Sequence, residues 1–254
     1  MKVYFLGTGT SQGIPVIGST HPVCLSSDLK DKRLRVSIWI QTEFESIVID
    51  CGPDFRQQML TSNCTAIDAI VFTHEHSDHT AGMDDIRSFS LKHGAMQLFC
   101  HQRVHENLKK RFDYIFETEN KYPGAPSVNV TEIDNSRPFF IGSTEVLPIS
   151  AWHGKLQVFG FRIGDFAYLT DVKCMEEDEI KKLYGVKTLV VNALKITEHH
   201  SHFSLQEALD FVNLVNPEVT YLTHISHLLG FHAEVEQLLP KNVFLAYDNL
   251  QIEV

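Results

Sequence analysis

The stretch VFTHEHSDHTAGMDDIR, residues 71–87, places three histidines and an aspartate within six residues, directly after an apolar run. These four residues are His74, His76, Asp78 and His79. Neutral imidazoles and carboxylates are both ligands of first-row divalent metals. Because a loop can turn two of these side chains toward one ion and two toward another, the pattern indicates a centre for two ions. A solvated polar loop is the alternative, but it leaves the length of the pattern and its position after a strand unexplained.

Three further candidate ligands also follow apolar stretches. His153 follows LPISAW, Asp171 follows FAYLT and His224 follows VTYLT. Residues that follow the strands of a layered fold can converge on one edge of it. Together with the cluster they supply seven ligands, which suits two ions with one carboxylate bridging them.

The order of strand-like and helix-like segments predicts an α/β fold with two sheets between layers of helices. RVSIWIQT at 35–42 and SIVIDCG at 46–52 are expected to pair as antiparallel strands, and FAYLTDV at 166–172 to be a strand. The expected helices are 54–62, 84–94, 103–116, 175–185 and, with Ser204 as its N-cap, 204–217.

Length and composition narrow the function. The chain has 254 residues, 43% of them hydrophobic, and no low-complexity linker, so we expect one domain over residues 1–254. The net charge of −10, from 22 basic and 32 acidic residues, disfavours a nucleic-acid partner. The five cysteines are scattered, the chain start lacks the pattern of a signal peptide, and no apolar run reaches the length of a membrane helix. We therefore expect a cytoplasmic protein.

A set of motifs along nearly the whole chain resembles the metallo-β-lactamase superfamily of dinuclear hydrolases. The motifs are FLGTGTSQGIP, THEHSDHTAG, WHG, LTD, THISH and AYDNLQI. Within that superfamily, GTGTSQGIPVIG, PVCLSSDLKDKRLR, IDCGPDFRQQML and GMDDIR are most similar to the PhnP-type phosphoribosyl cyclic phosphate phosphodiesterases. The resemblance implies a four-layer αββα sandwich and two active-site divalent ions, zinc or manganese.

The resemblance also divides the seven ligands between two ions bridged by Asp171. It implies that Asp50 holds one of the ligand imidazoles, although a turn at the strand end would also explain Asp50. The implied ligand sets are His74, His76 and His153 for the first ion, and Asp78, His79 and His224 for the second.

A second histidine-rich stretch, EHHSHFSLQEAL at 198–209, precedes the helix capped by Ser204. In the phosphodiesterases a histidine at this place faces the scissile phosphate, and the capping box selects His202 as its match. His199 and His200 are the alternatives, but exposed polar residues before a helix cap are the better explanation for those two.

PhnP-type enzymes commonly hold a third, structural zinc ion in a Cys-rich N-terminal loop. Here Ser19 and His21 stand where cysteines are common, while Cys24 remains and THISH retains His227. The resemblance therefore implies His21, Cys24 and His227 as ligands. Structural zinc sites use four ligands, so the fourth would be His232 or a water, and loss of the site is the alternative.

These residues predict a hydrolase that cleaves a small-molecule phosphodiester by attack of a metal-activated hydroxide. Asp78 would orient the nucleophile and His202 would stabilise the phosphoryl oxygen or protonate the leaving group.

Three different functions compete with this prediction. The first is a tRNA 3′-processing-type endoribonuclease. However, the insert at 103–139 has six basic and six acidic residues, so it resembles a short aromatic lid rather than a basic RNA-binding arm. The second is a glyoxalase-like thioester hydrolase, and the third is a metal-binding module without turnover. No membrane partner is expected, and a homodimer remains open.

Overall fold

In the computed structural model, which describes residues 1–254, the strands form two seven-stranded sheets. In spatial order, the first sheet contains β14 (Gln251–Glu253), β1 (Lys2–Gly7), β2 (Ser37–Gln41), β3 (Ser46–Ile49), β4 (Ala69–Val71), β5 (Met96–Cys100) and β6 (Val128–Glu132). The second contains β13 (Val243–Leu245), β12 (Val219–Thr223), β11 (Thr188–Asn192), β10 (Phe166–Tyr168), β9 (Leu156–Ile163), β8 (Thr144–His153) and β7 (Phe139–Ile141).

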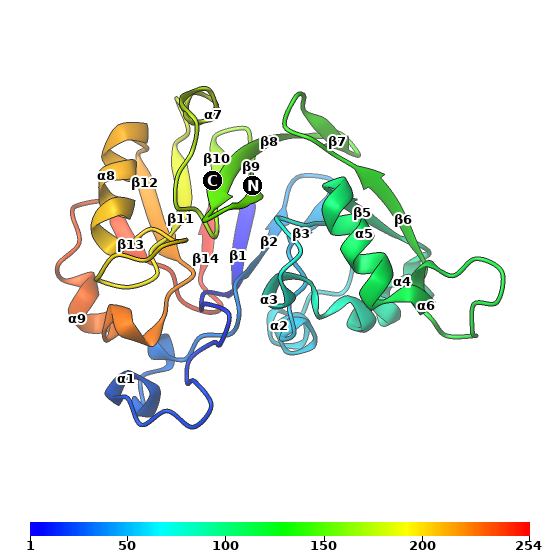
Figure 1. The fold of residues 1–254 in the computed structure, drawn as a ribbon, viewed down its shortest axis with the longest axis horizontal. Helices are drawn as coiled ribbons and strands as arrows, with labels where there is room; N and C mark the ends of the chain where they lie inside the picture. Colours follow the sequence, from blue (N-terminus) through cyan, green and yellow to red (C-terminus); the bar gives the residue numbers. More distant parts are fainter.

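Helices cover the outer face of each sheet (Figure 1). Those beside the first sheet are α2 (Phe55–Ser62), α3 (Ser77–Thr80), η2 (Met83–Ile86), α4 (Arg87–His93), α5 (Gln102–Arg111) and α6 (Asp113–Phe116). Those beside the second are α7 (Glu177–Lys181), α8 (Leu205–Val215) and α9 (His232–Glu236). The short elements α1 (Pro22–Leu25), η1 (Leu29–Asp31) and η3 (His227–Leu229) complete the chain. No helix is both long enough and apolar enough to cross a membrane.

The hydrophobic core consists of three layers of buried side chains. The middle layer, which includes Phe5, Ile38 and Phe161, lies between the two sheets. Another layer of side chains, which includes Phe55 and Leu98, lies between the first sheet and its helices. The remaining layer lies between the second sheet and α8. Three apolar interfaces require four structural layers, so the predicted αββα sandwich is confirmed.

Strand direction explains why the candidate ligands share one edge. β3, β4, β5 and β6 are parallel to one another, as are β10, β11, β12 and β13. β8 is antiparallel to β9, which is antiparallel to β10, so β8 runs in the direction of β10. The carboxyl ends of these strands therefore gather at one edge of each sheet.

Most expected elements occur, but several are shorter than predicted. The pairing of β2 with β3 is antiparallel, as expected. The strand expected at 166–172 ends at Tyr168, because Asp171 adopts a positive φ of 58° that an extended strand does not allow. The helix expected at 103–116 is interrupted at Phe112, whose φ of −129° and ψ of 44° are not helical. The helix expected at 175–185 spans only Glu177–Lys181, since Glu176 is extended with ψ 149°.

The chain segment after β3 supports the loop that follows β4. The Cys51 N–H donates to the His79 carbonyl over 2.8 Å, and the Gly82 N–H donates to the Cys51 carbonyl over 2.8 Å. The two backbones approach so closely at Gly52 that a Cβ there would lie 2.1 Å from the Asp78 carbonyl oxygen. Only glycine permits this contact, which places the turn carrying Asp78 and His79.

We therefore expect Gly52→Ala to displace the Asp78 turn, lower the free energy of unfolding by about 1–3 kcal/mol through overpacking, and weaken metal binding. Gly164→Ala is the control, because Gly164 has φ +56° but no atom within 4 Å of the added Cβ. It should cost roughly 1–2 kcal/mol of backbone strain without affecting metal binding. Thermal unfolding and metal titration of both variants provide the measurement. Equal metal affinities would contradict the proposed role of Gly52.

Candidate dinuclear metal site

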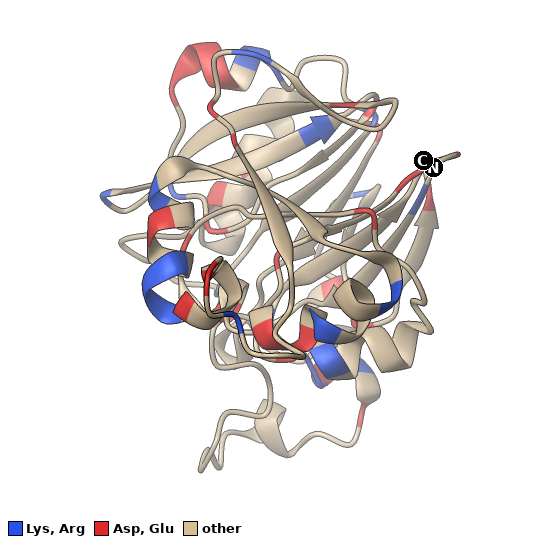
Figure 2. Ribbon diagram, turned by 90° about the vertical axis from the view of Figure 1, so that its right-hand side faces the viewer, with Lys and Arg blue, Asp and Glu red and all other residues tan.

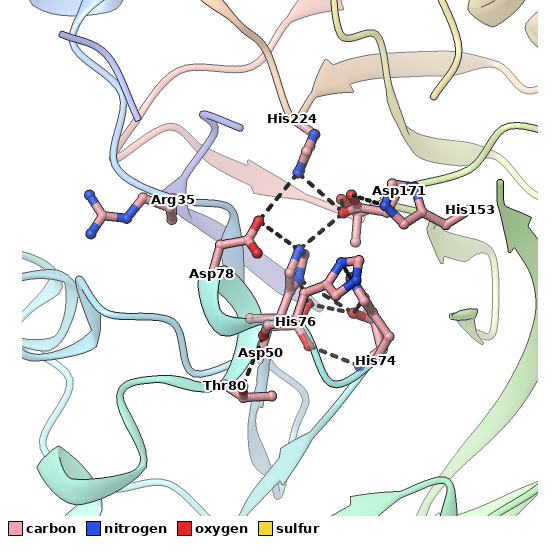
Figure 3. Close-up of polar contacts among 12 residues, drawn as sticks. Arg35, Asp50, His74, His76, Asp78, Thr80, His153, Asp171 and His224 are labelled. Carbon is pink, nitrogen blue, oxygen red and sulfur yellow. Dashed lines mark hydrogen bonds and ion pairs between the residues drawn. The ribbon is translucent and has the colours of Figure 1, made fainter. Parts of the chain in front are cut away.

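The seven predicted ligands come from both sheets and meet at the shared edge. The loop after β4 carries the cluster at 74–79, and β8 ends at His153. Asp171 and His224 lie beyond the ends of β10 and β12. The side chains of the six ligands labelled in Figure 3 point toward one another, and Asp78 and Asp171 face each other across the imidazoles. Arg35, which is also drawn there, points away from this centre and pairs with Asp54.

Three residues of the site adopt a backbone conformation that side chains normally avoid. Asp50, Asp171 and His224 have φ values of 66°, 58° and 53°. Every other non-glycine residue with positive φ in the chain is an asparagine, for which this conformation is least unfavourable. Strain of this kind costs about 1–3 kcal/mol per residue and concentrates at functional sites. Each of these residues turns the chain sharply after a strand, and the turn directs Asp171 and His224 into the centre and Asp50 against the imidazole of His79.

Asp50 is the buried hydrogen-bond acceptor beneath the site. Its carboxylate accepts from the backbone N–H and the hydroxyl of Thr73, each over 2.8 Å, and lies 2.6 Å from Nδ1 of His79. The Thr73 hydroxyl also lies 3.0 Å from Nδ1 of His74. A carboxylate can only accept, so the proton of the neutral His79 ring lies on Nδ1 and its Nε2 lone pair faces the centre. The structure thus places Asp50 where the sequence predicted, against a ligand imidazole.

The opposite side of the centre repeats this arrangement. Nδ1 of His153 lies 2.8 Å from the Ser201 carbonyl, which can only accept, so Nε2 of His153 also faces the centre. Orientation of ligand imidazoles through their other nitrogen is typical of protein metal sites.

Asp171 lies between the two groups of imidazoles. Its Oδ2 is 3.1 Å from Nε2 of His79 and 3.2 Å from Nε2 of His224. Its Oδ1 faces the other side, 3.9 Å from Nε2 of His153 and 2.8 Å from Nε2 of His202. The two oxygens of one carboxylate therefore point at the two predicted ligand sets, as a bridging ligand requires.

The donor atoms fit divalent ions. Nδ1 of His224 is buried without a partner, and Nε2 of His79 and of His224 face the Asp171 carboxylate without hydrogen-bond geometry. Such buried nitrogens are costly unless another group satisfies them. Three groups have ligand atoms within 4.8 Å of one another, and they share His79 or Asp171. These groups are His74 with His79 and Asp171, Asp78 with His79 and His224, and His153 with Asp171 and His202. His76 belongs to none of them, although its Nδ1 is 3.0 Å from Nε2 of His74.

Burial and the mixture of acids and bases shift the pKa values in the site. Burial alone raises the pKa of Asp171, but His224, His79 and a hydrogen bond from His202 hold that pKa well below the usual carboxyl range. Burial lowers the pKa of His74 well below its ordinary value, which keeps the ring neutral. Burial also lowers the pKa of His79, but Asp78, Asp50 and Asp171 outweigh it and raise that pKa well above the ordinary value.

His202 lies beside the bridging carboxylate, whereas the neighbouring histidines lie farther out. It is 8% exposed and its ring stacks 5.0 Å from that of His224. His199 contacts His202 through Nδ1 over 3.1 Å but has no contact with Asp171, and His200 is exposed. Burial, the largest effect, lowers the pKa of His202 to about 4. Among the three histidines considered from the sequence, His202 alone reaches Asp171.

The predicted structural zinc ligands are only partly assembled. The rings of His21 and His227 are 4.9 Å apart, and Nδ1 of His227 is buried without a partner. The ligand atoms of His21, Cys24 and His227 do not all lie within 4.8 Å of one another, so this site stays a prediction. Nδ1 of His232 lies 3.1 Å from the Arg33 guanidinium, which leaves that nitrogen engaged elsewhere.

Sequence reasoning missed the residues that orient the ligands. Thr73 and Ser201 immediately precede His74 and His202, and each contacts two imidazoles of the site. Arg111 of α5 donates to the Thr80 hydroxyl over 2.7 Å and thereby holds the far end of the ligand loop. A hydroxyl residue next to a candidate ligand was the only signal available, and hydroxyl residues are too common for that signal to be specific.

Comparisons with known proteins agree with this fold. A family model described as "Beta-lactamase superfamily domain" matches residues 45–225. A crystal structure described as a new diphosphatase from the PhnP family is 33% identical, with a TM-score of 0.93 over 100% of this chain and 97% of that one. The short form of human tRNase Z shares the fold, with a TM-score of 0.72 and 21% identity over 100% of this chain and 99% of that one.

A curated relative from Porphyromonas gingivalis (strain ATCC BAA-308 / W83), named octanoyltransferase, is 37% identical over 253 residues. The match covers 99% of this chain and 51% of the relative, so the chain spans about half of that protein's length. The residues that the family model matches, 45–225, include all seven predicted ligands, and the PhnP-family structure shares the fold over the whole chain. The chain therefore belongs to the beta-lactamase superfamily and is similar over its whole length to a protein described as a PhnP-family diphosphatase.

Proposed function

We propose that the protein is a dinuclear, metal-dependent phosphodiesterase that hydrolyses a small phosphodiester of the phosphoribosyl cyclic phosphate type. The observation that carries this proposal is the contact between His202 and Asp171, whose atoms Nε2 and Oδ1 are 2.8 Å apart. It places an N–H donor that is not a predicted ligand beside the carboxylate that would bridge two ions. A reacting phosphate at that carboxylate would lie within reach of His202.

The residues of the chain have separate roles in this proposal. Asp171 holds both halves of the site together, and Asp78 adds a carboxylate at 3.8 Å from Nε2 of His224. When bound, two divalent ions supply Lewis-acid activation of the phosphate and of a water molecule. His202 donates a hydrogen bond through Nε2 to the phosphoryl or leaving oxygen, where negative charge develops. Its low pKa indicates that the neutral ring is the donor at neutral pH.

A diphosphate is the second candidate substrate, because the 33% identical PhnP-family protein is described as a diphosphatase. Both substrates contain a P–O bond whose cleavage builds charge on phosphoryl oxygens. They differ in the leaving group, which is an alkoxide in a ribose diester and a phosphate in a diphosphate. The alkoxide depends far more on a hydrogen-bond donor or acid such as His202.

RNA processing and thioester hydrolysis have less support. Figure 2 shows both acidic and basic residues over the face that carries the insert at 103–139, and the six basic and six acidic residues of the insert give it no net positive charge for RNA. Thioester hydrolysis does not explain the position of His202.

The proposal includes a small molecule as the partner and, because the cysteines are scattered, a cytoplasmic location.

A panel of four substrates tests the proposal directly. It comprises phosphoribosyl cyclic phosphate, a dinucleoside diphosphate, a short single-stranded RNA and a glutathione thioester, each assayed with zinc and with manganese. We expect the highest kcat/KM for the cyclic phosphate. A higher kcat/KM for the diphosphate would select the second candidate, and turnover of the thioester or RNA alone would contradict both.

We expect two divalent ions per chain and a release of protons on binding. The carboxylates around His79 favour a proton on that ring, and a metal ligand must lose it. Metal affinity should therefore rise with pH. Calorimetric titration in two buffers of different ionisation enthalpy measures the protons released. A single ion at saturation, or heats independent of the buffer, would contradict the expectation.

Asp78→Ala should abolish turnover, because it removes a predicted ligand and the group that would orient the nucleophile. Asp178→Ala is the control, since Asp178 lies on α7 with a side chain 91% exposed. Initial rates at saturating metal, together with metal content, provide the measurement. A wild-type rate in Asp78→Ala would remove Asp78 from the site.

His202→Ala should lower kcat by about 10²–10⁴-fold on a ribose diester while both ions remain bound. The loss should be smaller on bis(p-nitrophenyl) phosphate, because nitrophenolate leaves without a proton. Equal losses on the two substrates would assign His202 to the phosphoryl oxygen instead of the leaving group. His200→Ala is the control, as His200 is exposed. Loss of metal from His202→Ala would show a ligand role.

A further inference from the structure

Ser201 is a buried residue between two parts of the site that the proposed function treats separately. It is 7% exposed and follows His200 in the loop before α8. Its carbonyl lies 2.8 Å from Nδ1 of His153, and its hydroxyl lies 3.1 Å from Nδ1 of His202. One residue thus contacts a predicted metal ligand through its backbone and the predicted donor to substrate through its side chain.

The hydrogen-bond partners of His202 restrict its tautomer. Its Nε2 faces the Asp171 carboxylate, which can only accept, so Nε2 carries a proton. In the neutral ring Nδ1 must then accept. Two groups lie close to Nδ1, namely the Ser201 hydroxyl at 3.1 Å and Nδ1 of His199 at 3.1 Å.

Only one of these two groups is free to donate. Nδ1 of His199 already faces the backbone N–H of Ser201 over 3.4 Å, and it accepts a hydrogen bond from that donor. A nitrogen that accepts in this way has no proton for His202. The Ser201 hydroxyl lies 3.1 Å from Nδ1 of His202 and 3.3 Å from Nδ1 of His199. Because Nδ1 of His199 already accepts from the Ser201 N–H, the hydroxyl proton is the one available to Nδ1 of His202.

We propose that Ser201 is a positioning residue whose hydroxyl holds His202 as the Nε2–H tautomer and whose carbonyl orients His153. Without the hydroxyl, only the Asp171 carboxylate still favours a proton on Nε2, and in part of the molecules the proton of the neutral ring moves to Nδ1 and faces His199. The lone pair of Nε2 would then point at the substrate and repel a phosphoryl oxygen. This inference rests on the proposed function for its effect on rate, but its effect on the tautomer does not depend on any substrate.

The test compares Ser201→Ala, which removes the hydroxyl and keeps the carbonyl, with Ser201→Thr, which keeps both. Ser204→Ala is the matched control, because Ser204 caps α8 in the same loop through the Glu207 N–H and carboxylate and contacts no imidazole. The Ser204 variant should lower the melting temperature without changing the tautomer of His202.

Nitrogen-15 NMR of histidine-labelled protein, with zinc bound and without metal, reports the tautomer. The His202 signals are assigned as those missing from His202→Ala. We expect the Nε2–H form in the wild type and Ser201→Thr, and a mixture of tautomers in Ser201→Ala. The kcat of Ser201→Ala on a ribose diester should fall about 3- to 10-fold, as loss of one hydrogen bond implies, with KM and metal content unchanged.

Three results would overturn the proposal: an unchanged tautomer in Ser201→Ala, loss of metal from that variant, or an unchanged kcat despite a changed tautomer. Failure of the proposed function looks different. In that case the wild type would not turn over any phosphate substrate, while the NMR comparison of the three serine variants would still decide the role of the Ser201 hydroxyl.

Discussion

The hydrogen bond between the buried carboxylate of Asp50 and Nδ1 of His79, 2.6 Å long, is the interaction on which the site depends. Both side chains are fully buried. A carboxylate at that depth is costly without partners, and Thr73 and His79 provide them. In return, Asp50 determines which nitrogen of His79 faces the centre. The pair connects β3 to the ligand loop after β4, so the first sheet places one side of the site directly.

The second sheet places the other side of the site through the turns that follow its strands. Asp171 and His224 follow β10 and β12, and each turns into the centre through a positive φ. The core between the sheets holds the two edges together, so packing at residues such as Phe161 and Ile38 sets the distance between the ligand groups. Since no single loop contains the site, neither sheet can form it alone. The imidazoles of His79 and His224 lie next to the carboxylates of Asp78 and Asp171 and offset the repulsion between these carboxylates.

Much of this arrangement could be predicted from the sequence, for a physical reason. An apolar strand followed by histidine or aspartate can be recognised from the local sequence. Because parallel strands end at the same edge of a sheet, the meeting of such residues can be predicted before any contact is known. The fold class and the meeting of all seven predicted ligands at one edge followed from that signal. The strand expected at 166–172 was too long, because hydrophobicity continues through Leu169 while the backbone already turns toward Asp171.

The roles of Thr73, Ser201 and Gly52 could not be predicted in this way, because each depends on a contact across the fold. Ser201 meets His153 from a distance of 48 residues along the chain, and Gly52 meets Asp78 from the neighbouring loop. Sequence spacing identifies groups that can bind a metal, whereas tautomer and orientation depend on what lies behind each ring. A centre with correct ligands and incorrect tautomers would present protons to an ion instead of lone pairs. Any ion or substrate at this candidate site would therefore be selected as much by the hydroxyl, carbonyl and carboxylate groups behind the imidazoles as by the imidazoles themselves.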